Sequence, residues 1–198
     1  FVATGFQKDT PLYIDGLDGS EGAAHGVFAA LDLLERVRNG ERPDLGAKAL
    51  VIGGGDTAMD ATRVAQRLTG NPTTIVYRRT REQMPAYNEE IEEALLEGVE
   101  LRILTQPTSL ILDENGAVAE LECEPLALGD FDRSGRRRPT SAPEAKFRLR
   151  ADQVIAAIGQ TLDLDGVFNG TQAATTERGF VAVTPSTGQT SLPWLFAG

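Results

Sequence analysis

The stretch Ala-Leu-Val-Ile-Gly-Gly-Gly-Asp-Thr-Ala, residues 49–58, decides the fold. Its first four residues form a short, uninterrupted apolar run, which is typical of a parallel strand buried on both faces. The glycines that follow contain the pattern Gly53-x-Gly55-x-x-Ala58, which is a fingerprint of strand-to-helix turns that bind dinucleotides. Glycine-rich turns are common, so the meaning of this pattern depends on the segments around it.

Those segments complete a unit of strand, turn, helix and strand. After the turn, apolar residues recur at helical spacing between residues 59 and 68, and Gly70 follows as a stop. The β-branched run 73–77 predicts a second strand. The unit closes within about 30 residues, as a dinucleotide-binding unit requires. The sequence therefore predicts an α/β protein with a Rossmann-like, three-layer dinucleotide-binding domain. A purely structural strand-to-helix turn is the alternative.

Each residue of the turn has an expected role. Gly53 permits a tight turn, Gly55 lets a pyrophosphate approach the backbone, and Ala58 allows the helix to pack closely on the strand. The amide groups at the start of the helix favour a diphosphate, and Thr57 adds a hydroxyl donor. Asp56 would repel a pyrophosphate, so we expect its side chain to point away, in a capping or ion-pairing role. The predicted residues that hold or border the pyrophosphate are Gly53, Gly54, Gly55, Asp56 and Thr57.

The end of the second strand indicates which dinucleotide is bound. An acidic residue there would accept hydrogen bonds from the ribose hydroxyls of NAD or FAD, but none occurs between Asp60 and Glu82. The chain has Arg78 and Arg79 instead, and a guanidinium fork matches a 2′-phosphate. Solvated surface arginines are the alternative. Because these residues occupy the position that discriminates between cofactors, the sequence predicts NADPH.

Further helices and strands are expected around this unit. Val27 and the apolar residues up to Val37 recur at helical spacing, and an acidic helix with Asn88 as its N-cap ends at Gly98. An Arg- and Pro-rich stretch, 129–145, is expected to be a surface loop with Arg136, Arg137 and Arg138 at its solvated tip, or in contact with a partner. Strand-like runs cover 100–105, 107–113, 117–124 and 154–159, and Asn115-Gly116 predicts a hairpin turn between the second and the third of them.

Composition excludes several classes of function. The 198 residues contain 19 Lys and Arg against 29 Asp and Glu, a net charge of −10, which disfavours nucleic acid and membranes as partners. A single cysteine, Cys123, permits no internal disulfide and indicates a reducing, cytoplasmic location. Cys123 is expected to be a small core residue on the apolar face of a strand. The single histidine, His25, is expected to face solvent or cap a helix, and no metal site is predicted.

The run from Val51 to Ala86 also resembles a known family, the NADPH-binding domain of the glutamate synthase small subunit and its relatives. The shared segments are Val-Ile-Gly-Gly-Gly-Asp-Thr-Ala-Met-Asp, Val-Tyr-Arg-Arg and Met-Pro-Ala. The relatives include NADPH-dependent iron–sulfur flavoproteins and the flavin-containing part of dihydropyrimidine dehydrogenase. Outside this run, Ala3-Thr4-Gly5 is similar to a strand that closes an FAD segment. Ala157–Gln160 is similar to the return motif, and Pro193–Gly198 to the approach to a flavin-binding Gly-Asp pair.

The resemblance implies a portion of a larger, cytoplasmic flavoprotein with a small antiparallel β insertion in its NADPH-binding domain. In the parent protein, hydride passes from NADPH to FAD, and electrons pass onward to an iron–sulfur domain or a partner subunit. The residues Ala157, Ile158 and Gly159 are implied to lie beside the nicotinamide end. The expected domain bounds are 1–22 for a remnant of the FAD domain and a connector, 23–172 for the NADPH-binding domain, and 173–198 for the return toward the FAD domain.

Two functions are compatible with this resemblance. The first is the oxidoreductase just described, of which the isolated fragment is expected to be inactive because most of the FAD site is implied to lie elsewhere. The second is a non-catalytic module that binds NADPH and regulates a partner. A second GxGxxG turn and a following Gly-Asp pair in a longer parent sequence would favour the oxidoreductase.

Overall fold

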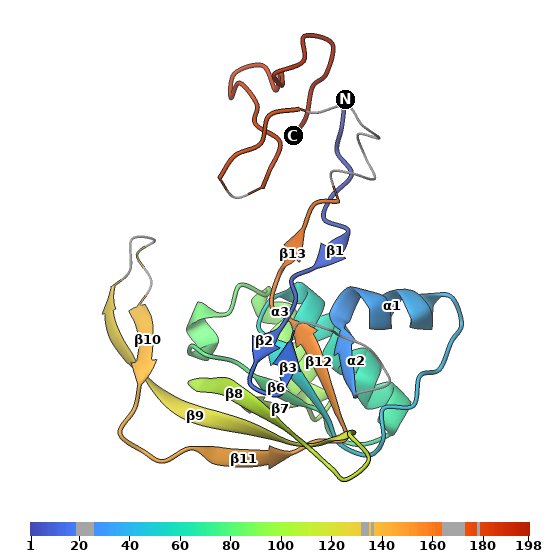
Figure 1. Cartoon of the computed structure of the whole chain (residues 1–198), viewed down its shortest axis with the longest axis vertical. Coiled ribbons are helices and arrows are strands. Elements are labelled where there is room, and N and C mark those ends of the chain that lie inside the picture. The colour runs from blue at the N-terminus through green and yellow to red at the C-terminus, as the bar shows by residue number, and fades with distance from the viewer. Residues whose placement is uncertain (19–25, 132–134, 136, 164–172, 178) are drawn as a thin grey trace. The chain divides into compact units, whose positions relative to one another are not determined.

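The computed structural model describes residues 1–18, 26–131, 135, 137–163, 173–177 and 179–198. They form two compact units, one of Phe1–Thr10 with Gln160–Gly198 and one of Pro11–Gly159 (Figure 1). The domain bounds expected from the sequence stay a prediction, because their junctions at 22 and 172 belong to segments outside the described residues.

The described part of the larger unit is built on a five-stranded parallel sheet in the order β4-β12-β5-β6-β7. All five residues of β5 are buried, because the sheet is covered on both faces, and this explains the uninterrupted apolar run of that strand. The strands are β4 (Val27–Ala29), β5 (Ala49–Gly53), β6 (Thr74–Val76), β7 (Glu100–Arg102) and β12 (Gln153–Ala157).

Three α-helices of the described chain pack on one face of this sheet. They are α1 (Ala30–Arg38), α2 (Asp56–Thr69) and α3 (Asn88–Leu96), and a short 3₁₀ helix, η2 (Arg81–Gln83), lies between α2 and α3 in the chain. One apolar cluster contains Leu33, Met59 and Ile91 from the three helices together with Val51 and Ile155 from the sheet. The helical stripe predicted after the glycine turn is therefore the face of α2 that packs on the sheet.

A four-stranded antiparallel sheet in the described chain covers the opposite face. Figure 1 shows β9 (Val118–Phe131) as a long strand that pairs with β11 (Phe147–Arg150) along one part and with β10 (Arg137–Ser141) along another. The fourth strand, β8 (Thr105–Leu112), pairs with β9 across the turn that Asn115-Gly116 predicts. Leu121 and Cys123 of β9 pack with Val154 of β12 in a second apolar cluster. The layers are thus helices, parallel sheet and antiparallel sheet, and the predicted Rossmann-like α/β fold is confirmed.

Three local predictions are wrong. Val27 begins a strand, and α1 starts only at Ala30, because Val27 pairs with Val154 of β12 at the edge of the sheet. Asn88 is the first residue of α3, and Tyr87 occupies the N-cap position. The stretch 129–145 is not a loop throughout, because β9 continues to Phe131 and β10 pairs with it. In each case, pairing or packing with a distant segment outweighs the local signal.

The smaller unit brings the two ends of the chain together. Val2 and Ala197 form a parallel bridge, in which the Val2 amide donates to the Phe196 carbonyl at 2.8 Å. The first and last few residues of the described chain are thus paired through this bridge. Two short strand pairs complete the description: β1 (Lys8–Asp9) with β13 (Gln160–Thr161) in this unit, and β2 (Tyr13–Ile14) with β3 (Leu17–Asp18) in the larger one.

Candidate dinucleotide-binding site

The predicted site residues follow the carboxyl ends of three neighbouring strands, β12, β5 and β6. Because these strands are parallel, their carboxyl ends lie at one edge of the sheet. The glycine turn follows β5, Arg78 and Arg79 follow β6, and Ile158 and Gly159 follow β12. From β5 the chain adds β6 and β7 on one side and returns to β12 on the other. Such a switch point is where open α/β sheets bind ligands.

The three glycines of the turn have different surroundings. Gly53 has a φ of +150°, and a Cβ built on it would lie 2.2 Å from the carbonyl oxygen of Ala157. A Cβ on Gly54 would lie 2.6 Å from the ring of Tyr77, whereas the nearest atom to a Cβ on Gly55 is Cγ of Pro85, at 3.8 Å. The packing of the chain therefore requires the first two glycines. At Gly55 the described chain leaves room for a side chain.

Helix α2 starts directly at this turn. Gly55 is its N-cap and has an extended backbone, and a glycine has no side chain with which to cap the helix. The Gly55 carbonyl accepts hydrogen bonds from the amides of Ala58 and Met59, at 2.9 and 3.2 Å. Ala58 is fully buried, so the helix packs closely on the sheet as the fingerprint predicts. The first amides of a helix point outward along its axis, and they favour an anion there.

The segment between β6 and α3 folds back over the turn. The Ala86 amide donates to the Gly54 carbonyl at 3.1 Å, and the Tyr77 hydroxyl donates to the Gln83 carbonyl at 2.8 Å. The Tyr87 amide, at the N-cap of α3, donates to Oδ1 of Asp56 at 3.0 Å. Asp56 thus has a structural contact of the capping kind expected from the sequence, but it caps a neighbouring helix. The contact connects the starts of α2 and α3.

Arg78 and Arg79 line a pocket of about 520 Å³ in the larger unit, which we call the arginine pocket. Arg78 is exposed and Arg79 is half-buried. Strands β8, β9 and β10 supply the other described lining residues, which are Gln106, Glu124, Leu126, Arg138, Pro139 and Ser141. None of these lining residues belongs to the glycine turn. The two predicted parts of the site therefore lie at neighbouring strand ends and border different spaces.

Two charged residues of the arginine pocket, Glu124 and Arg138, were not predicted from the sequence as site residues. Glu124 lies opposite Gln106 in the β8–β9 pair, and its Oε1 lies 3.5 Å from the Ser141 hydroxyl. Arg138 belongs to the stretch interpreted as a surface loop; it is instead an exposed residue of strand β10 that lines this pocket. Arg136, the first residue of the same predicted tip, lies outside the described residues. The alternation of apolar and polar residues along the strand around Cys123 could have placed Glu124 on its polar face. No local pattern identifies Arg138.

The third predicted segment adjoins the glycine turn. Ala157 is the last residue of β12, and it pairs with Gly53 across the parallel sheet. Ile158 is 41% exposed, and Gly159 is exposed with a φ of +127°. The edge therefore has two exposed residues on the side of the turn away from the arginines.

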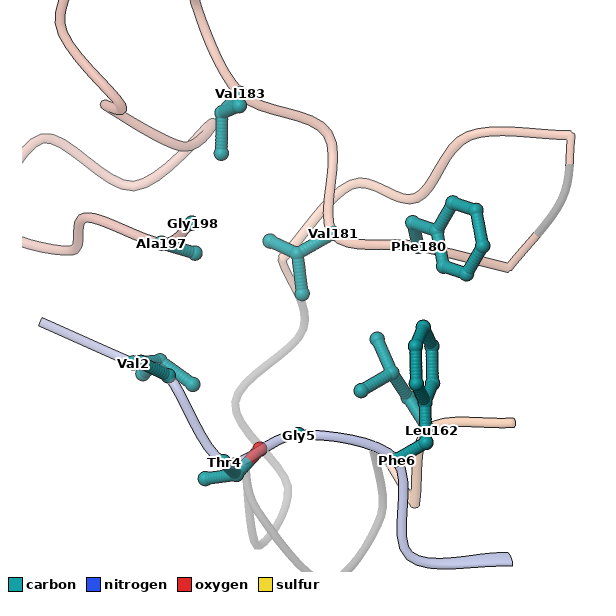
Figure 2. A pocket seen from close by; sticks show the side chains of 11 residues that line it. Val2, Thr4, Gly5, Phe6, Leu162, Phe180, Val181, Val183, Ala197 and Gly198 are labelled. Carbon is teal, nitrogen blue, oxygen red and sulfur yellow. The ribbon is translucent and has the colours of Figure 1, made fainter. Parts of the chain in front are cut away.

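The smaller unit contains a separate pocket of about 320 Å³, shown in Figure 2. No ionisable side chain is among the described residues that line it. The rings of Phe6 and Phe180 contact each other at its wall, with centroids 5.7 Å apart, and the segment with Thr4 and Gly5 forms another part of the wall. A pocket of this composition suits an apolar ring better than a phosphate group.

Cys123, which was singled out in the sequence, lines neither of these pockets. Cys123 is fully buried, and burial raises the pKa of its thiol to about 12, with a smaller contribution from Glu122. Its prediction as a small core residue is confirmed. His25 lies outside the described residues. Within the described ranges, no group of three or more His, Cys, Asp or Glu side chains is arranged to hold a metal ion. No helix in those ranges has the length and apolar character needed to cross a bilayer.

The family follows from the comparison of the whole chain with known families. Residues 1–198 match the family model described as pyridine nucleotide-disulphide oxidoreductase. The chain belongs to this family. The β subunit of the NADPH-Fe(3+) oxidoreductase of Geobacter sulfurreducens is 41% identical over 165 residues, which are 83% of this chain and 24% of that protein. The small chain of the NADPH glutamate synthase of Escherichia coli is 35% identical over 155 residues, 73% of this chain and 32% of that protein.

These relatives confirm the resemblance inferred from the sequence. The chain spans no more than about a third of the length of either protein. Among solved structures, FprA of Mycobacterium tuberculosis in complex with NADPH has a TM-score of 0.65 at 19% identity, over 94% of this chain and 52% of that one. Thioredoxin reductase of T. acidophilum has a TM-score of 0.64 at 16% identity, over 96% and 53%. At these identities the similarity shows a shared fold.

Proposed function

We propose that this chain is the NADPH-binding portion of an FAD-dependent oxidoreductase of the glutamate synthase small subunit type. The observation that carries the proposal is the pair Arg78 and Arg79 in a pocket beyond β6, next to a glycine turn that opens a helix. A 2′-phosphate distinguishes NADPH from NADH, and paired guanidinium groups recognise it. Membership of the family and a relative whose name includes NADPH support this cofactor.

The order of the strands suits an extended dinucleotide. The diphosphate lies in the middle of a dinucleotide, between its two nucleosides. The turn after β5 likewise lies between the ends of β6 and β12. We propose that the backbone of Gly53–Thr57 binds the diphosphate, with the open space at Gly55 allowing close approach. The adenosine end, with its 2′-phosphate, then lies toward Arg78 and Arg79. The nicotinamide end lies toward Ala157, Ile158 and Gly159.

The role of this chain in the reaction is to hold and orient its cofactor. When bound, NADPH would supply the hydride for reduction of FAD. The exposed residues Ile158 and Gly159 would border the nicotinamide end, while the turn and the arginines would hold the remainder of the cofactor. The catalytic contribution proposed for the chain is therefore positioning, and no side chain of the chain is assigned an acid or base role.

FAD fits this chain only in part. The sequence contains one fingerprint turn, which the proposal assigns to NADPH. The pocket of the smaller unit is apolar and about 320 Å³ in volume, so its residues, including Thr4 and Gly5, would contact only part of a flavin. We propose that an FAD domain of the same longer protein holds most of the flavin. We propose that an iron–sulfur domain or partner subunit receives the electrons. The names of two relatives, a β subunit and a small chain, support a partner subunit.

Calorimetric titration of the chain with NADPH and NADH tests the cofactor. We expect tighter binding of NADPH, and loss of about 2 to 5 kcal/mol of this preference when Arg78 and Arg79 are both replaced by alanine. The matched control replaces Arg38 and Arg42, two exposed arginines around the end of α1, and should keep the preference. Equal affinities of the unmodified chain for the two nucleotides would contradict the proposal.

A second measurement tests the assignment of the glycine turn. After incubation with excess FAD and desalting, the chain should show no flavin absorption and should not oxidise NADPH with an artificial acceptor, because most of the flavin contacts are unmade. Retained stoichiometric flavin would instead assign the turn to FAD. A longer parent protein that binds NADPH but carries no flavin and oxidises no NADPH would favour the non-catalytic sensing module.

A further inference from the structure

We infer that Arg138, on strand β10, is a third cation of the 2′-phosphate site and a determinant of the preference for NADPH over NADH. This inference rests on the proposed function, because it concerns the same nucleotide. It adds the antiparallel sheet to the recognition of the cofactor, whereas the fingerprint assigns that recognition to the end of β6 alone. It also gives a role to one residue of the arginine cluster in the 129–145 stretch.

Two adjacent arginines of β10 differ in their surroundings. Arg137 donates from Nε to the Gly129 carbonyl at 2.9 Å and from Nη2 to the Leu128 carbonyl at 2.6 Å. Its guanidinium is therefore hydrogen-bonded to the backbone of β9. The β9–β10 pairing shifts register between Arg137 and Pro139. Arg138, at this shift, lines the arginine pocket with Arg78 and Arg79. Its guanidinium makes no hydrogen bond or ion pair with any residue in the described ranges.

The charges in the pocket suit a phosphate monoester. Its described lining includes three arginines and a single carboxylate, that of Glu124, so the formal charge of the wall is +2 in a chain of net charge −10. A phosphate monoester carries about −1.5 to −2 at neutral pH. Without Arg138 the wall would have two arginines against Glu124. Arg138 therefore supplies about half of the net positive charge of the pocket wall.

Glu124 makes the selectivity depend on Arg138. A carboxylate beside the adenosine ribose accepts hydrogen bonds from the hydroxyls of NADH and repels the 2′-phosphate of NADPH. Among the described residues, the Glu124 carboxylate accepts only one long hydrogen bond, from the Ser141 hydroxyl at 3.5 Å. Arg138 offsets this charge from the same pocket wall. Its removal should therefore weaken the binding of NADPH and leave the binding of NADH unchanged.

The test compares Arg138→Ala with Arg150→Ala, which removes an exposed arginine from β11 of the same sheet but outside the pocket. Calorimetry with NADPH, NADH and 2′,5′-ADP gives the dissociation constants. For Arg138→Ala we expect an increase of about 10-fold or more for NADPH and 2′,5′-ADP and no change for NADH, since hydrogen bonds to charged groups contribute about 1.5 to 3 kcal/mol. Arg138→Lys keeps the charge but loses the guanidinium fork, so its dissociation constant for NADPH should lie between those of the unmodified chain and of Arg138→Ala. Arg150→Ala should bind all three ligands as the unmodified chain does.

The outcomes separate this inference from the proposed function. If Arg138→Ala leaves the NADPH constant unchanged while the Arg78 and Arg79 double variant raises it, the inference is wrong and the proposed function stands. If Arg138→Ala weakens NADPH and NADH equally, Arg138 does not determine selectivity and the inference is again wrong. If the unmodified chain does not distinguish NADPH from NADH, the proposed cofactor and the inference fail together. Circular dichroism of each variant verifies that the fold is kept.

Discussion

The glycine turn and the arginine pocket follow neighbouring strands of one sheet, yet they are built in different ways. The turn consists of six consecutive residues, 53–58, and its requirements are steric: the packing around Gly53 and Gly54 excludes side chains. The pocket takes its walls from the end of β6 and from three antiparallel strands, and its requirement is charge. Substitutions in the turn should therefore affect folding or the binding of any dinucleotide. Those in the pocket should affect the choice between two dinucleotides.

The largest effect is expected at the most constrained glycine. Gly53→Ala places a Cβ 2.2 Å from the Ala157 carbonyl oxygen at a φ of +150°, so the backbone of β5 or β12 must move. Strain and overpacking should together lower the free energy of unfolding by about 2 to 6 kcal/mol. Urea unfolding followed by circular dichroism measures this loss. A Gly53→Ala chain as stable as Gly55→Ala would show that the turn is less rigid than its geometry indicates.

The next effect separates binding from folding within the turn. Gly55→Ala meets no atom of the described chain closer than 3.8 Å, so its free energy of unfolding should change by no more than about 1 kcal/mol. If the diphosphate lies against this residue, the affinity for NADPH and for NADH should fall by the same factor, about 10-fold or more. Titration of both nucleotides measures it. A loss confined to NADPH would mean that the turn and the arginine pocket are not separate in function.

A smaller effect reports on the sheet that carries the pocket. Cys123 lies on β9 next to Glu124, and burial raises the pKa of its thiol to about 12. At pH 8 only about one thiol in 10,000 would be ionised, and it packs against the central strands. We expect negligible modification by a thiol reagent in buffer, and modification that rises together with global unfolding in urea. Modification well before the loss of helical signal would show that the antiparallel sheet opens independently of the turn.

The smallest effect concerns the helices beside the turn. Arg63 of α2 donates to Glu97 after α3, and this hydrogen bond is the main reason that the pKa of Glu97 lies below its usual 4.5. A lowered pKa in the folded chain means that the ionised carboxylate contributes stability above pH 4.5, and that this contribution is lost as the pH falls through the lowered value.

The variant Glu97→Gln should therefore melt slightly below the unmodified chain at pH 7, and the difference should shrink as the pH falls below 4.5 through the lowered pKa of Glu97. Because the pair is at the surface, we expect a small shift. Glu35→Gln, an exposed residue of α1 without a side-chain ion pair in the described chain, serves as the control. A difference between Glu97→Gln and the unmodified chain that persists unchanged in acid would assign the effect to packing rather than to ionisation. Nucleotide selectivity should not change, because neither Arg63 nor Glu97 lines the arginine pocket.

Much of the parallel layer could be predicted from the sequence. The apolar run of β5, the stripe of α2 and the glycine at its end are patterns within short windows, and the structure keeps them. Arg78 and Arg79 could be placed near the end of β6 because only Tyr77 separates them from this strand. The edge strand β4 could not, since Val27 also fits a helical stripe and only its pairing with Val154 decides the matter.

The sequence by itself determined the glycine turn, the strands and helix around it and the two arginines that follow, because each depends on residues a few positions apart. Only the tertiary structure decided which other charges share the pocket of those arginines. Glu124 and Arg138 reach it through the register of β9 with β8 and with β10. Strand pairing joins residues far apart in the chain, and one residue of slip would present the opposite set of side chains. No local pattern contains that information, so a pocket assembled across strands becomes visible only when the sheet is formed.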